Sequence, residues 1–162
     1  MSIKAKIASK YIPPYEKNKK YFQLLMEYLI ATYDSLKEEY GADKTKVLLS
    51  TISARTGIQV AQILKNELAL GESYESAVLS WKIGCTLLGF TIHTINHKEG
   101  ILFYHDTDPL WQCFRKKNLD LCECMCVPMV NAVAQEFYRH CSTHFEHPPS
   151  LQSPCIKLLK RT

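Results

Sequence analysis

Apolar residues recur every three or four positions through the first half of the chain, which is the spacing of helices with one buried face. One such repeat covers residues 18–40 and is ended by Gly41. A second covers residues 43–70 and contains Gly57, which costs about 1 kcal/mol against alanine but lets another backbone approach closely. The pattern predicts a pair of long helices with one outer side free, a natural surface for a homodimer.

A third helix and a hairpin follow. Ser73 can cap a helix over residues 74–88, because its hydroxyl can accept a backbone N–H of the first turn. The apolar period then falls to two over residues 90–95 and again over residues 101–105. Turn-forming residues 97–100 separate these two runs, so the segment predicts a β-hairpin.

Prolines organise the last third of the chain. Pro109 and Pro128 each fit the first turn of a helix, where a missing N–H costs nothing. The first helix is expected to be short, and the second to run to about residue 141 or 144. The segment 117–126 has no clear period. Residues 155–159 are apolar and are expected to form the last strand.

This order of elements predicts the fold class. Strands joined by tight turns make an antiparallel sheet, and the helices are expected to pack on one face of it, which is an α+β fold with a long N-terminal helical pair. No internal repeat is present. Residues 1–17 are expected to form an irregular arm, because Pro13 and Pro14 exclude a helix there, and residues 18–162 a single domain.

Composition narrows the classes of function. The chain has 162 residues, of which 46% are hydrophobic and 22% are charged, as in globular proteins. A net charge of +4 is too small to indicate nucleic-acid binding. No apolar run approaches the ~18–20 residues of a membrane span, and the lysine-rich N-terminus does not resemble a secretory signal. A cytoplasmic location is therefore expected.

Seven cysteines change this picture, since six of them lie after residue 112. In a reducing compartment, clustered thiols favour metal binding, nucleophilic catalysis or redox sensing over disulfides. A buried cysteine can also act simply as a small apolar residue, which is the interpretation favoured for Cys85. The seven are Cys85, Cys113, Cys122, Cys124, Cys126, Cys141 and Cys155.

The string from Cys122 through Cys124 to Cys126 permits a metal site. In an extended segment all three sulfurs point one way, whereas in a helix they fan out by about 200° per two residues. Three thiolates with a further cysteine or histidine suit tetrahedral zinc, and four thiolates also suit an iron–sulfur cluster. Candidates to complete the set are Cys155, Cys113, His140 and His144.

A thiolate nucleophile is the alternative. Cys126 lies just before Pro128, where the free N–H groups of a helix start would favour a thiolate. A histidine such as His105 or His140 could act as its base. Cys126, Cys122 and His105 are therefore the candidate catalytic residues of a cysteine-dependent hydrolase.

Several short stretches carry a resemblance to a known family. They are Arg55-Thr56-Gly57, Gly89-Phe90 before the hairpin, Asp108-Pro109-Leu110 after it, the segment from Cys122 to Cys126, and Cys155. Together they resemble the 4-vinyl-reductase-type small-molecule-binding domains, which share a fold with the Bet3-like subunits of the transport-protein-particle complex. Leu121-Cys122-Glu123 is also similar to the thiazoline-carboxylate hydrolase branch.

The resemblance implies a domain that binds a small apolar molecule between the sheet and the long C-terminal helix, with thiols at the pocket mouth that bind a metal or sense redox state. Small-molecule sites have such apolar walls with a few polar groups. A cysteine- or metal-dependent hydrolase of a small ring or amide, and a dimeric adaptor with structural cysteines, remain alternatives. The expected lining residues are Phe90, Ile92, Phe103, Trp111, Met129, Val133 and Phe137.

Overall fold

The structure is a computed structural model that describes residues 14–107 and 119–162. The predicted arm up to residue 13, the short helix at Pro109, Trp111 and Cys113 lie outside the described residues. The elements are α2 (Pro14–Tyr40), α3 (Ala42–Leu68), α4 (Tyr74–Leu87), β1 (Thr91–His97), β2 (Gly100–Thr107), η1 (Cys122–Cys126), α6 (Val127–Phe137), β3 (Cys141–His147) and β4 (Ile156–Arg161).

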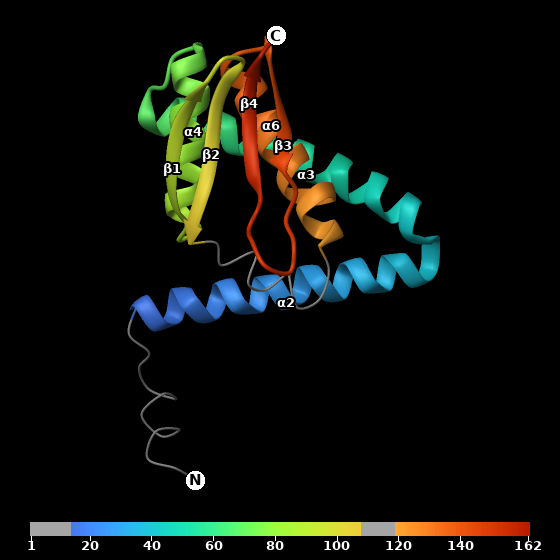
Figure 1. The fold of residues 1–162 in the computed structure, drawn as a ribbon. Coiled ribbons are helices and arrows are strands. Elements are labelled where there is room, and N and C mark those ends of the chain that lie inside the picture. The colour runs from blue at the N-terminus through green and yellow to red at the C-terminus, as the bar shows by residue number, and fades with distance from the viewer. Residues whose placement is uncertain (1–13, 108–118) are drawn as a thin grey trace.

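The predicted pair of long helices is confirmed. α2 lies across the base of the molecule and α3 returns from its end at an angle, so the two form an open V (Figure 1). Gly41 joins them with φ at 80°, a backbone conformation that favours glycine. α2 begins at Pro14 rather than at residue 18, because a proline is accepted in the first turn of a helix.

The third helix and the hairpin are confirmed as well. Ser73 Oγ accepts the backbone N–H of Ser76 at 3.0 Å and so caps α4. β1 and β2 then pair antiparallel, with His97 opposite Gly100 at the turn. A bulge between Thr91 and Ile92 shifts the register at the open end of this hairpin.

The four described strands form one antiparallel sheet in the order β1-β2-β4-β3. In Figure 1, α4 and α6 lie behind this sheet, and no described helix is drawn in front of it. Helices on one face of an antiparallel sheet are the α+β arrangement that the sequence predicts.

Strand β3 corrects one prediction. The long helix was expected to reach residue 141 or 144, but α6 ends at Phe137 and Tyr138 is extended, with φ −151° and ψ 100°. The Asn131 side chain then accepts the backbone N–H of Thr143 at 2.8 Å, which holds the returning chain against α6. Residues 141–147 pair with β4. The pairing of Cys141 with Arg161 places this polar segment in the sheet rather than at a helix end.

Buried side chains form two clusters. The larger one lies between the sheet and the helices behind it and includes Trp81, Phe103, Phe137 and Leu159. The smaller one lies where α2 and α3 contact η1, with Tyr33 fully buried at its centre. Tyr33 also donates a hydrogen bond of 3.2 Å to Asp120, just before η1. η1 is therefore packed against α2 and α3 on one side and the main body of the domain on the other.

Gly57 has the role that the sequence predicts. It lies on the buried face of α3 where α6 crosses. A Cβ built at Gly57 would overlap the backbone carbonyl oxygen of Met129 and would lie 3.0 Å from the Cβ of Ala132. The absence of a side chain is what lets the two helix backbones approach this closely.

α3 is long and apolar enough to cross a membrane, by length and composition alone, although no membrane span was expected from the sequence. The core helix of a soluble protein can have the same composition. One face of α3, carrying Leu49, Gly57, Ala61 and Leu64, is buried in the protein. This finding is therefore weak evidence for a membrane span.

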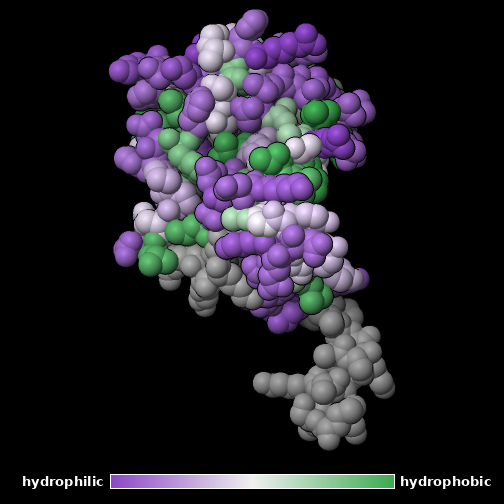
Figure 2. All heavy atoms as spheres, turned by 90° about the vertical axis from the view of Figure 1, so that its right-hand side faces the viewer, coloured by the Kyte–Doolittle hydropathy of each residue, from purple (hydrophilic) through white to green (hydrophobic). Residues whose placement is uncertain are grey.

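Apolar side chains are exposed on the N-terminal helical pair. On α2 they include Leu24 and Tyr28, and on α3 they include Val47 and Ile52. Figure 2, which views the side where the two helices join, shows hydrophobic groups separated by hydrophilic ones rather than one continuous patch. Dimerisation through this pair stays a prediction.

Candidate functional site

An apolar cavity of about 280 Å³ lies between the sheet and the helices behind it. Leu87, one of its lining residues, is 77% exposed. Segments from most of the chain contribute to its wall. The lining residues are Val60 of α3; Ser80, Trp81, Gly84, Cys85 and Leu87 of α4; Leu88, Phe90 and His105; Cys122 and Cys126 of η1; Met129, Val130 and Val133 of α6; and Cys155 and Lys157.

The polar groups on the sheet side of the cavity come from β2 and β4. Residues two apart in an extended chain share a face, so Cys155 and Lys157 point the same way. Phe103 lies opposite Lys157 and Tyr104 opposite Ile156 in the antiparallel register. The next residues are His105 on β2 and Cys155 just before β4, and extending the register by one residue places the histidine beside the thiol.

Lys157 is an unusual member of this wall because its side chain is only 3% exposed. Its Nζ donates a hydrogen bond of 2.8 Å to Cys155 Sγ and lies 5.8 Å from the centre of the Phe145 ring. Lysine is almost never fully buried unless its ammonium group is paired. The sheet therefore places a buried lysine side chain on the wall of a cavity that is otherwise mostly apolar.

Cys122 and Cys126 form the opposite wall. η1 is a widened π-helical turn in which the N–H of Val127 donates to the carbonyl of Cys122. A side-chain hydrogen bond joins Cys122 and Cys126. This bond, burial and the nearby Cys126 and Cys155 sulfurs raise the pKa of Cys122, against an opposing effect of Lys157. Cys122 is therefore held as a neutral thiol.

The position of Cys126 corrects the argument for a nucleophile at a helix start. The backbone is helical without a break from Asp120 to Phe137, and Cys126 itself has φ −67° and ψ −51°. The N–H groups after Cys126 are therefore used inside a helix, as the Val127–Cys122 bond shows. Cys126, Cys122 and His105 do line the same cavity, and catalysis by them stays a prediction.

The structure brings together only part of the predicted metal-ligand set, because Cys122, Cys126 and Cys155 line the cavity and the other described candidates do not. Cys124 packs in the smaller core cluster and does not line the cavity, because a helical segment fans out alternate residues. His144 is exposed on β3, where it contacts Ser142 at 2.8 Å, and His140 lies in the connection before β3. Among residues 14–107 and 119–162, no group of three or more His, Cys, Asp or Glu side chains could hold a metal ion.

Three of the predicted lining residues, Phe90, Met129 and Val133, do line the cavity. Phe103 instead lies in the core, where it stacks on Trp81 with ring centres 4.1 Å apart. Ile92 and Phe137 also pack in the core, not on the cavity wall.

The residues that sequence reasoning missed are mostly on α4. Trp81 and Cys85 lie on the buried face of α4, and that face also lines the cavity. Gly84 offers a sequence signal, since a glycine inside a helix often marks a close approach or an open space. Nothing lies within 4 Å of a Cβ built at Gly84. Lys157 gives no signal, because a lysine in a terminal strand is usually exposed.

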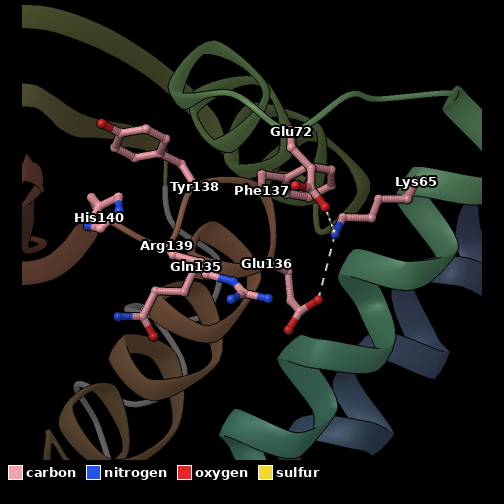
Figure 3. A pocket seen from close by; sticks show the side chains of 8 residues that line it. All are labelled: Lys65, Glu72, Gln135, Glu136, Phe137, Tyr138, Arg139 and His140. Atoms are coloured by element: carbon pink, nitrogen blue, oxygen red, sulfur yellow. Dashed lines mark ion pairs between the residues drawn. The ribbon is translucent and has the colours of Figure 1, made fainter.

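A second recess, between α3, α6 and the connection to β3, is polar and has a volume of about 330 Å³. Figure 3 shows Lys65 extended between Glu72 and Glu136, which it meets at 3.7 Å each. The Lys65 ammonium also lies 5.4 Å from the centre of the Phe137 ring. Since the half-buried Lys65 is already paired with two carboxylates, this recess is a weaker candidate for a binding site.

Two buried thiols outside the cavity lead to a pH prediction. Burial raises the pKa of Cys124 and of Cys141 to about 11, from an ordinary value of 9.0. The native state then keeps protons that the unfolded chain loses. The free energy of unfolding is therefore expected to be unaffected by these thiols below about pH 9, and to fall between about pH 9 and 11 by up to about 1.4 kcal/mol per pH unit for each thiol.

Denaturant unfolding of the wild type and Cys141→Ala between pH 8 and 10.5 checks this. Above pH 9, the free energy of unfolding should fall less steeply for the variant than for the wild type. The difference between the two slopes is the contribution of the Cys141 thiol. Other titrating groups, such as lysines and tyrosines, are common to both proteins. Identical slopes would show that Cys141 does not contribute.

Comparison with known proteins adds to this geometry. No family model matches the chain, and no curated protein matches it in sequence. Among solved structures, it is similar to the crystal structure of the phenol-responsive sensory domain of the transcription activator PoxR with phenol. The two superpose with a TM-score of 0.63 at 12% identity, over 84% of this chain and 73% of the other. The chain has the fold of that sensory domain.

Proposed function

We propose that this chain is a small-molecule-binding domain whose ligand occupies the cavity between α4, α6 and the sheet. The observation that carries the proposal is the cavity itself. Its walls are mostly apolar, and its few polar groups, which include His105 and Lys157, are concentrated on the sheet side. That arrangement is typical of sites that bury an apolar ligand and orient it through a few polar contacts.

The size of the cavity limits the ligand. About 280 Å³ is near the lower end of ligand pockets, which run from about 300 to 1,000 Å³. Trp81 and Phe90 provide flat apolar surfaces in its wall. We therefore infer a small molecule, such as one with a single aromatic ring.

The structural neighbour supports the same interpretation. The PoxR domain is described as phenol-responsive and its structure contains phenol. We further propose that the domain has a sensory role and that it belongs to the 4-vinyl-reductase-type domains. Zinc binding has less support, because no group of three or more His, Cys, Asp or Glu side chains among the described residues is placed to hold a metal ion.

Gly84 offers the sharpest test. Because a Cβ there meets nothing within 4 Å, Gly84→Leu should extend its side chain into the cavity and weaken binding at least tenfold. Gly84→Ala is the matched control: it should retain binding and raise the free energy of unfolding by about 0.5–1 kcal/mol through helix propensity.

Titration calorimetry with phenol and a panel of one-ring aromatics measures both variants against the wild type. Thermal unfolding of the same samples shows whether each variant is folded. Binding that survives Gly84→Leu in a folded protein would place the ligand elsewhere. If no member of the panel binds the wild type, the proposal fails for molecules of this class.

A further inference from the structure

α2 is apolar on two opposite faces. One face packs into the domain, where Met26, Ile30 and Tyr33 belong to the smaller buried cluster. The opposite face carries Leu24 and Tyr28, whose side chains are 66% and 69% exposed. Figure 1 shows α2 below the rest of the domain, so this second face is directed away from it. A surface helix of a globular protein normally has one apolar face, and a second one indicates a partner.

The exposed face of α2 has the spacing of a coiled-coil seam. Its residues are separated alternately by three and four positions over two heptads, which is the repeat that lets two helices pack along their length. All of them are exposed, so the seam is open to a second helix. They are Tyr21, Leu24, Tyr28, Ala31 and Ser35.

The charges of α2 select the kind of partner. The same repeat continues to Lys17 before the seam and to Glu38 after it. Three lysines and one glutamate lie within residues 14–20, whereas three carboxylates and one lysine lie within residues 34–40. A parallel pair of α2 helices would bring like charges together at both ends. An antiparallel pair places each basic end beside the acidic end of the other copy, so α2 is complementary to itself.

We propose that the chain forms a homodimer in which the α2 helices of two copies pack antiparallel along this seam. A two-fold axis near the middle of α2 brings Lys20 of each copy beside the partner's Asp34. Both residues are exposed, and Lys20 contacts Gln23 of its own helix at 3.4 Å. Glu27 lies near the axis, at the edge of the seam, and faces the partner's Glu27. The charge preference for this orientation therefore comes from the two ends of the interface.

The same arrangement matches large side chains with small ones. Tyr21 and Leu24, which precede the axis, lie opposite the partner's Ala31 and the partner's Ser35, which follow it. In a coiled coil, large side chains of one helix insert into spaces between side chains of the other. Tyr28 lies next to the axis, where the two copies of its ring contact the facing helix. The interface lies outside the ligand cavity, so this inference does not depend on the proposed function.

Sedimentation equilibrium of the wild-type chain at micromolar concentrations tests the dimer, and it should give the mass of two chains. Leu24→Glu places a charge in the middle of the seam and should raise the dissociation constant of the dimer at least tenfold. Ile52→Glu is the matched control, because Ile52 is 55% exposed but lies on α3. It should dimerise as the wild type does. Circular dichroism of the same samples shows that each variant is folded.

Exchange of two charges tests the orientation. Lys20→Asp and Asp34→Lys should each raise the dissociation constant about three- to tenfold at low salt, because each brings like charges together at both ends of the interface. The double variant restores opposite charges and should return the constant to within about threefold of the wild-type value. In a parallel dimer these positions would be about 21 Å apart along the axis, too far for one change to compensate the other.

A wild-type chain that stays monomeric would overturn the proposal, as would a dimer that survives Leu24→Glu in a folded protein. Loss of the dimer in Ile52→Glu with its retention in Leu24→Glu would place the interface on α3. If both single charge variants weaken the dimer and the double variant is no tighter than either, the antiparallel orientation is wrong.

Discussion

Phe103→Ala should lower the free energy of unfolding by about 3–5 kcal/mol, the usual cost of removing a large aromatic side chain from a core. Phe103 has no exposed surface and lies in the central strand β2. Its ring stacks on Trp81 with an angle of 10° between the planes. The alanine variant would therefore lose both transfer free energy and an aromatic contact, and would leave a hole beside the ligand cavity.

Chemical denaturation followed by circular dichroism measures this loss. Phe103→Leu is the control, since it keeps most of the volume and should cost about 1–2 kcal/mol. Because Trp81 lines the cavity, Phe103→Ala should also widen the site and weaken binding of a one-ring ligand. A loss below about 1 kcal/mol in the alanine variant would show that the Phe103–Trp81 stack is not part of the stable core.

Gly57→Ala should destabilise the protein by about 1–3 kcal/mol, although alanine is the better helix former. The added Cβ would meet the carbonyl oxygen of Met129, which belongs to the backbone and cannot rotate away. α3 and α6 would have to separate. Since Met129 also lines the cavity, ligand affinity should fall together with stability.

Gly84→Ala makes the comparison direct, because it is the same substitution within a helix but meets nothing within 4 Å. The two variants should therefore shift the free energy of unfolding in opposite directions. Equal, small changes in both would show that the crossing of α3 and α6 can relax around a methyl group.

Much of the fold could be predicted because local signals agreed with packing. The capping serine at residue 73, the period of two around the hairpin and Gly57 each have one dominant physical meaning, and the structure confirms all three. β3 could not be predicted in the same way. Its residues Ser142 and His144 are polar, and only pairing with β4 makes the segment a strand.

The candidate site was harder to predict than the fold. The cysteine string indicated the right region, but whether its sulfurs share a face depends on a backbone conformation without a sequence period. In a helical turn, Cys122 and Cys126 line the cavity and Cys124 does not. Lys157 was missed because its burial depends on the sheet register and on Phe145, which are long-range features.

The π-turn at η1 affects how the ligand selectivity of this cavity can change in evolution. It holds one residue more than an α-helical turn, as the bond from Val127 to Cys122 shows. A one-residue deletion in this turn would restore α-helical geometry and rotate the preceding residues by about 100° relative to α6. Different side chains would then face the cavity while the core strands and helices stayed in place. A single-codon change could thus remodel ligand selectivity, with no gradual series of substitutions.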